Sequence, residues 1–273
     1  FDVNNVNDES LVHNSDNVAI EKEVAIEQFV PSIATQDSDE EEVSNTIISR
    51  KEALAAADRI VVRGKKISGS ISLTGMRIDD ISLNNYFTDI DNKENVTLLS
   101  PAGTDYGFYV ESGWLISDSS VAVPNASTEW RFNRDSERIL TSGGIVTLEW
   151  DNGQGFLFTR EISLDDNYMI QVKQSVTNKT KVEKQVNAWH LISRHNLPAD
   201  YKGMSILHEG PIAFLNKKLN EISYKDLLKG EVTSQDKVRG WVGFTDKYWF
   251  TGILPSPHEA FNARILSVRS RGR

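Results

Sequence analysis

The amino-acid sequence predicts an all-β protein, built as one large antiparallel β-sandwich. Apolar and polar residues alternate in several short segments beyond residue 59, which is the pattern of half-buried strands. Turn-forming residues separate these segments, and the helices of about ten to fifteen residues that a parallel sheet would need between its strands are missing. No repeat of fixed length runs through the chain, which argues against propellers and solenoids.

The first part of the chain, residues 1–59, differs in composition from the rest. It is rich in Asn, Asp, Glu and Ser, and its Val and Ile residues follow no steady period. The acidic run Asp37–Glu42 is either a docking tail for a basic partner or, in the preferred interpretation, a solvated spacer that buries too little surface to offset chain entropy. We therefore expect a disordered acidic linker over 1–59 and one folded β-domain over 60–273. Helix formers between Thr46 and Ala57 predict a short helix.

The folded part is predicted to consist of strands joined by tight turns. Asp151–Gly155 contains Asn-Gly, which accepts positive φ at low cost, so this segment predicts a β-hairpin. Segments 165–167 and 177–181 separate further strands in the same way. A short helix over 224–229 is expected at the edge of the sandwich. The clearest predicted strands are 60–62, 67–73, 77–83, 145–150, 156–162 and 168–176.

Charge and composition exclude several classes of function. A net charge of −9 disfavours non-specific binding to nucleic acids and to anionic lipid surfaces, because both attract positive fields. The absence of cysteine excludes disulfides, thiolate catalysis and the common structural zinc sites. No window approaches the ~20 apolar residues of a membrane-spanning helix. Since the chain begins at Phe1 and not at methionine, we expect a targeting or anchoring helix to precede it, and membrane contact only through segments outside this chain.

Histidines provide the best candidates for an active site. Trp189, His190, His195 and His208 define a candidate cleft, in which two imidazoles and the neighbouring Glu209 could share acid and base duties, as in a sugar epimerase. On one strand, however, His190 and His195 are five positions apart and point to opposite faces. The simpler interpretation is that one histidine packs beside Trp189 while the other ends the strand. We predict no catalytic residue and no enzyme activity.

Metal and cofactor sites are not predicted either. Apart from the adjacent His208 and Glu209, no His, Asp or Glu has the spacing of a known ligand motif. The pair of glycines in Gly153-Gln154-Gly155 lacks the third glycine and the helix of a dinucleotide fingerprint, and no Gly-x-Ser-x-Gly elbow is present. Most tryptophans are expected in the core, with one or two facing a cleft: Trp114, Trp130, Trp150, Trp189, Trp241 and Trp249.

Five segments in the same order resemble one protein family. The most telling is Gly240–Phe250, in which two closely spaced glycines accompany Trp241, Trp249 and Phe250 as well as Phe244 and Tyr248. The others are Gly69–Asp80, Leu98–Gly103, Thr147–Gly155 and Leu207–Ile212. Together they resemble the periplasmic domain of the YidC family of bacterial membrane protein insertases, of the alphaproteobacterial type, over about residues 69–261.

This resemblance implies a β-supersandwich similar to galactose mutarotase, without its enzyme activity. It implies a non-catalytic platform for protein contacts, on the periplasmic side of an inner-membrane protein that assists insertion and folding of membrane proteins with or without the Sec translocon. The implied partners are SecD, SecF and the Sec translocon and, in the full-length protein, nascent membrane proteins. By position, the implied partner surface lies within about Pro211–Val238 and includes Pro211, Phe214, Lys217, Lys218, Tyr224, Asp226 and Leu227.

The family's insertase activity belongs to a later bundle of five membrane-spanning helices, which this chain lacks. After Arg264 the resemblance lapses into a basic tail, 265–273, so we expect the sandwich to be incomplete at its C-terminus and the chain to end before the insertase core. The alternative function is a carbohydrate-binding or aldose-epimerase-like enzyme, suggested by the fold likeness and the three histidines. A secreted sandwich with an unrelated ligand is the third possibility.

Overall fold

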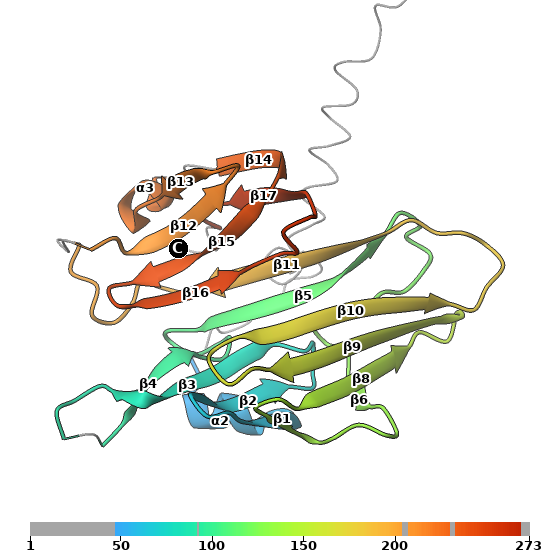
Figure 1. Cartoon of the computed structure of the whole chain (residues 1–273), viewed down its shortest axis with the longest axis horizontal. Coiled ribbons are helices and arrows are strands. Elements are labelled where there is room, and N and C mark those ends of the chain that lie inside the picture. The colour runs from blue at the N-terminus through green and yellow to red at the C-terminus, as the bar shows by residue number, and fades with distance from the viewer. Residues whose placement is uncertain (1–46, 92, 204–206, 230–232, 269–273) are drawn as a thin grey trace, which may run out of the picture. The chain divides into compact units, whose positions relative to one another are not determined.

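The computed structural model describes residues 47–91, 93–203, 207–229 and 233–268 (Figure 1). These residues form short strands and two short helices. In chain order the elements are α2 (Arg50–Ala55), β1 (Arg59–Arg63), β2 (Ile67–Ser72), β3 (Ile78–Phe87), β4 (Asn95–Leu99), β5 (Phe108–Ile116), β6 (Arg131–Phe132), β7 (Ile139–Thr141), β8 (Ile145–Asp151), β9 (Phe156–Leu164), β10 (Ile170–Asn178), β11 (Val186–Arg194), β12 (Gly210–Leu215), β13 (Lys218–Glu221), α3 (Tyr224–Leu228), β14 (Thr233–Val238), β15 (Gly240–Asp246), β16 (Trp249–Ile253) and β17 (Phe261–Ile265).

The strands form four sheets. The large sheet has the order β11-β5-β3-β2-β1-β7, with β4 beside β3, and the second sheet has the order β10-β9-β8-β6. The small sheet, orange to red in Figure 1, has the order β13-β12-β15-β16, and β14 pairs with β17 in a two-stranded sheet. The strand pairs are antiparallel except β1 with β7. The predicted all-β antiparallel fold is therefore confirmed, although the sequence did not indicate the one parallel pair.

One hydrophobic core joins the large sheet and the second sheet into a sandwich. Alternate residues of β9 point into it, and Phe158 and Ile162 are almost fully buried there. They pack in the same cluster as Ile60 and Ile71 from the large sheet. Burying one such side chain stabilises the fold by about 1.5–3 kcal/mol, so this shared core holds the two layers together.

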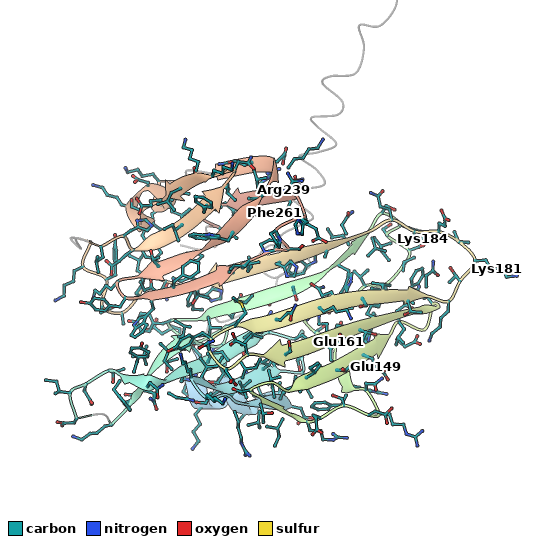
Figure 2. All side chains as sticks on the ribbon, viewed as in Figure 1. Glu149, Glu161, Lys181, Lys184, Arg239 and Phe261 are labelled. Carbon is teal, nitrogen blue, oxygen red and sulfur yellow. The ribbon has the colours of Figure 1, made fainter. Side chains whose placement is uncertain are left out.

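A second, smaller core lies under the small sheet. Ala213 and Leu215 of β12 are buried against Val238 and Ala263, which belong to β14 and β17. Figure 2 shows Phe261, which packs against this cluster, beside Arg239 at the end of these strands. One face of the small sheet is thus covered, and its other face is left outside this core.

The predicted hairpin and helices are confirmed at their expected positions. β8 and β9 pair antiparallel across Asp151–Gly155, where Gly153 has φ +69° and the Asn152 Oδ1 atom accepts from the backbone N–H of Gln154 at 2.8 Å. α3 falls within the predicted range 224–229. Neither helix in the described part of the chain has the length and apolar character needed to cross a membrane.

The boundary of the predicted linker is corrected by α2. Ser49 and Glu52 form a capping box that starts this helix, as its helix formers indicate. Arg50 then donates to the Leu99 carbonyl oxygen at 3.1 Å and pairs with Asp80 of β3. These contacts attach residues 47–59, which the composition assigned to the linker, to the large sheet. Residues 1–46 of the predicted linker lie outside the described residues.

Candidate functional site

Trp189 is held by the strand pair β11 and β5, where it lies opposite Gly113. A Cβ atom at Gly113 would lie 2.6 Å from the Cζ2 atom of Trp189, so the indole ring covers the glycine backbone. The tryptophan fills a place that a side chain on β5 would otherwise take. This contact is packing, and it explains why a small residue stands at position 113.

His190 and His195 lie in different surroundings. His190 lies on β11 opposite Ser112, and its pKa is lowered first by burial and then by the positive charge of Arg160. His195 lies beyond the end of β11, where its backbone N–H donates to Gly107 at 2.7 Å. The His195 Nε2 atom is 3.3 Å from the Tyr109 hydroxyl, and the two rings meet edge to face.

His208 is separate again. Its Nε2 atom lies 3.1 Å from the Pro211 carbonyl oxygen, and because that oxygen can only accept, the imidazole nitrogen donates. Its own carbonyl oxygen accepts from the Thr245 hydroxyl at 3.1 Å. His195 and His208 therefore each have a local hydrogen-bonding neighbour, and the structure does not bring the three histidines around one point. Among the described residues, no group of three His, Asp or Glu side chains is arranged to hold a metal ion.

His195 is expected to titrate below the ordinary histidine value of 6.5. Its pKa is lowered first by burial and then by the positive charge of Arg77, while Glu111 opposes the shift. A lowered folded-state pKa means that the unfolded chain binds the proton first, so stability is full above pH 6.5 and falls as the pH drops toward the folded value. An NMR titration of the His195 ring checks the midpoint.

The variant His195→Gln provides the control for this prediction. It keeps a hydrogen-bonding side chain near Tyr109 but cannot titrate. Its free energy of unfolding in urea should therefore fall less than that of the parent between neutral pH and pH ~5. An NMR titration midpoint of His195 at or above pH 6.5 would contradict the lowered pKa. So would an identical pH dependence of the free energy of unfolding in the two proteins.

A set of buried ion pairs on the large sheet was not anticipated from the sequence. Arg59 pairs with Asp79, and Arg77 pairs with Glu111, whose carboxylate is almost fully buried. Burial raises the pKa of Asp79 in spite of the attraction of Arg59. Each of these two carboxylates forms an ion pair with an arginine, which indicates that the cluster has a structural role in the sheet. Alternation along β3 puts Asp79 on the same face as the buried Ile81 and Leu83, but nothing local in the sequence identifies the arginine that pairs with it.

Arg160 is a charged residue in the sandwich core. It is 2% exposed, and its guanidinium lies 4.9 Å from the ring centre of Trp114 and 4.8 Å from that of Trp130. Burial lowers its pKa to about 9, against the attraction of Glu111. It donates to the Ser112 carbonyl oxygen. Stacking on two indole faces is the favourable interaction that keeps this cation inside.

A second buried arginine connects the large sheet to the small sheet. The Arg194 guanidinium lies 3.7 Å from the ring centre of Phe108 and pairs with Asp246 of β15. The other carboxylate oxygen of Asp246 accepts from the Tyr224 hydroxyl at 3.1 Å. Burial raises the pKa of Asp246, and the Arg194 charge opposes this shift. We call Arg194, Asp246, Tyr224 and Phe108 the junction.

The predicted partner surface divides into exposed and buried residues. Pro211 and Tyr224 are buried, and Tyr224 belongs to the junction, so neither side chain is free to contact a partner. This corrects their place in the predicted surface, since helix and strand geometry turns them inward. The remaining members lie on two elements and are exposed or partly exposed: Phe214, Lys217 and Lys218 at the β12–β13 hairpin, and Asp226 and Leu227 on α3.

Asp226 has a structural role besides its exposure. Its carboxylate accepts from the Ser223 hydroxyl at 2.6 Å and from Lys229 at 2.8 Å, and these two partners lower its pKa. Its backbone N–H donates to the Ser223 side chain, which caps α3. The capped helix therefore holds Leu227 in a fixed position, and α3 follows directly after β13 in the sequence.

Comparison with known proteins places these features in a family. Residues 59–271 match the family model described as the YidC periplasmic domain. This match extends past Arg264, so the expected end of the resemblance at that residue is corrected. A relative named membrane protein insertase YidC, from Jannaschia sp. strain CCS1, is 40% identical over 238 residues, covering 83% of this chain and 38% of that protein.

Further relatives carry the same printed name. The protein from Nitrobacter hamburgensis is 38% identical over 230 residues, covering 83% of this chain and 37% of its own length. The protein from Pelagibacter ubique is 32% identical over 254 residues, covering 92% of this chain and 44% of its own length. The chain thus spans well under half the length of the curated relatives that it matches.

Proposed function

The chain belongs to the YidC periplasmic domain family, and from this premise we propose that it is the non-catalytic docking domain of a membrane protein insertase. In the full-length protein it would lie in the periplasm, attached to the inner membrane by segments outside this chain. The insertion and folding of inner-membrane proteins, with or without the Sec translocon, would be the activity of the whole protein.

The separation of the histidines supports a role without catalysis. The positive charge of Arg160 lowers the pKa of His190, the His195 ring lies beside the Tyr109 hydroxyl, and the His208 imidazole donates to a backbone carbonyl oxygen. General acid and base catalysis needs its groups within reach of one reacting atom. The relatives are named as insertases and not as sugar-converting enzymes, which favours the insertase interpretation over the aldose-epimerase alternative.

The observation that carries the docking proposal is the exposed pair of elements after β12. The β12–β13 hairpin exposes Phe214 and two lysines, and α3 exposes Leu228 while Leu227 is partly exposed. Apolar side chains flanked by charges on a rigid, capped scaffold are typical of a protein interface. SecD and SecF, which the family resemblance implied, are the proposed partners, with nascent membrane proteins as substrates of the whole protein.

Replacing Leu227 and Leu228 by serine is expected to weaken the capture of SecD and SecF by about tenfold, which is the usual loss when a small apolar hot spot is removed. The measurement is recovery of purified SecD and SecF on the immobilised chain. Ile145→Ser with Val182→Ser is the matched control, because both of these apolar residues are exposed on other strands and loops. Equal recovery on the α3 variant, the control and the parent would refute this docking surface.

A further inference from the structure

One face of the small sheet carries a row of apolar side chains that no other helix or strand in the described part of the chain covers. Leu219 of β13 lies opposite Phe214 of β12, and Phe214 lies opposite Trp241 of β15. Phe214 and Trp241 stack with ring centres 6.2 Å apart, and Trp241 meets Phe250 of β16 at 5.1 Å. We call Leu219, Phe214, Trp241 and Phe250 the aromatic row. Leu219 is 50% exposed, Phe250 44% and Phe214 36%.

The glycines of the most telling sequence segment build this row. Gly243 and Gly252 lie opposite each other on β15 and β16. A Cβ atom at Gly243 would lie 2.6 Å from the Phe250 ring, and one at Gly252 would lie 2.3 Å from it. The two glycines therefore let Phe250 lie flat across two strands, in contact with Trp241. A large apolar ring is held at the surface by local packing and is not an accidental exposure.

Positive charge gathers beside the row, at one end of the strands that carry it. Lys217 and Lys218 lie at the β12–β13 turn, and Asn216 joins this turn to Arg239 through two backbone-anchored hydrogen bonds of 2.9 and 3.1 Å. Lys237 lies two positions before Arg239, and all four cations are exposed. None of the four forms an ion pair with another described residue. We call them the basic edge; the exposed carboxylate Glu221 lies at the other end of β13.

We propose that the aromatic row and the basic edge together bind an anionic lipid surface. Tryptophan and other apolar residues beside lysine and arginine are the combination that settles at a membrane interface, where rings enter the headgroup region and ammonium groups meet lipid phosphates. A peptide strand would instead seek an unpaired sheet edge or a groove. The row lies across the face of four strands, β13, β12, β15 and β16, which suits a planar partner.

The overall charge of the chain does not oppose this contact. Charges in solution act over about 10 Å at ordinary ionic strength. The cations closest to the lipid surface therefore contribute more to binding than the distant acidic residues do. Figure 2 shows Glu149 and Glu161 on the second sheet, apart from Arg239. The net charge of −9, from which no lipid binding was expected, conceals this uneven distribution. The inference goes beyond the proposed docking of SecD and SecF. It shares Phe214, Lys217 and Lys218 with that surface but does not depend on it, because vesicles that hold neither protein test it separately.

Co-sedimentation of the chain with lipid vesicles tests the proposal. The parent is expected to bind vesicles of phosphatidylcholine mixed with phosphatidylglycerol and not vesicles of phosphatidylcholine alone. Lys218→Gln with Arg239→Gln is expected to lower the partition coefficient roughly 30-fold, from the usual contribution of a cation close to an anionic surface. Phe214→Ser with Leu219→Ser is expected to lower it at least about tenfold. Brominated lipid should quench the tryptophan fluorescence of the parent more than that of the variant Trp241→Phe.

Matched variants on other elements provide the controls. Lys51→Gln with Lys181→Gln removes two exposed cations, and Ile145→Ser removes an exposed apolar residue; both should bind as the parent does. No binding to anionic vesicles would overturn the proposal, as would binding that depends on the cations but not on the aromatic row. Self-association of the parent without lipid that is lost in the variant Phe214→Ser with Leu219→Ser would show that the aromatic row binds a second copy of the chain. That result would also overturn the proposal.

Discussion

Gly240→Ala is expected to destabilise the domain by about 3–5 kcal/mol, because backbone strain and overpacking add at this position. Gly240 has φ +140°, a conformation that L side chains rarely adopt, and a Cβ atom there would lie 1.7 Å from the Phe214 carbonyl oxygen. That oxygen is part of the β12 backbone, which cannot move without disturbing its pairing with β15. Urea unfolding followed by tryptophan fluorescence measures the loss.

Gly153→Ala is the matched control for this prediction. Gly153 also has positive φ, +69°, but nothing lies within 4 Å of its added Cβ atom. Only the left-handed conformation is disfavoured there, so the cost should be about 1–2 kcal/mol. Equal losses in the two variants would show that the close approach of β12 to β15 at Gly240 does not limit the side chain.

Asp246→Ala is expected to destabilise the fold by about 3–5 kcal/mol, because it leaves the buried cation of Arg194 without its partner. The Arg194 side chain is 8% exposed, and Asp246 is its ion-pair partner in the junction. The variant also removes the acceptor of the Tyr224 hydroxyl. Because this pair links β11 to β15, the small sheet should lose protection from hydrogen exchange before the sandwich does.

Two variants separate the ion pair from the hydrogen bond. Tyr224→Phe removes only a hydroxyl donor and should cost about 1 kcal/mol. Arg194→Leu with Asp246→Leu removes both charges and should be more stable than Asp246→Ala alone, since no unpaired charge stays buried. If the double variant is as unstable as Asp246→Ala, the loss comes from packing and not from the uncompensated cation.

The pH dependence of Asp246 has a definite sign. Its folded pKa is raised above the ordinary 3.8, mainly by burial. The folded state therefore binds the proton more tightly than the unfolded chain does. This contribution to stability is fully present below pH 3.8 and is lost as the pH rises through the folded pKa. In Asp246→Asn the contribution is absent, so the parent should gain stability relative to this variant on acidification.

The strands of the sandwich could be predicted because their signal is local. Alternation with a period of two identified β8, β9 and β10, and Asn-Gly identified the hairpin between β8 and β9. The same rule puts Arg160 on the inner face of β9, whereas its charge suggests the outside. The stacking rings of Trp114 and Trp130 decide that conflict, and they come from distant parts of the chain.

The candidate site was predicted less completely. The sequence singled out the histidines for their chemistry, but the neighbours of His195 and His208 are the Tyr109 hydroxyl and a backbone carbonyl, which no spacing reveals. The partner surface stays a prediction from family position, and the burial of Tyr224 against Phe244 of β15 could not be predicted from the sequence. Which side chain meets which neighbour depends on strand order, and strand order is not a local property.

The fold class, the main strands and turns, and membership of the insertase family can be read from the amino-acid sequence, because they rest on composition, on the period of apolar residues and on ordered segments. The attachment of α2, the pairing of Arg194 with Asp246 and the place of Trp241 in the aromatic row beside the basic edge depend on the folded chain. A formal net charge of −9 is a sum over residues. The field that a partner meets depends on the distance of each charge from its neighbours, and folding sets those distances.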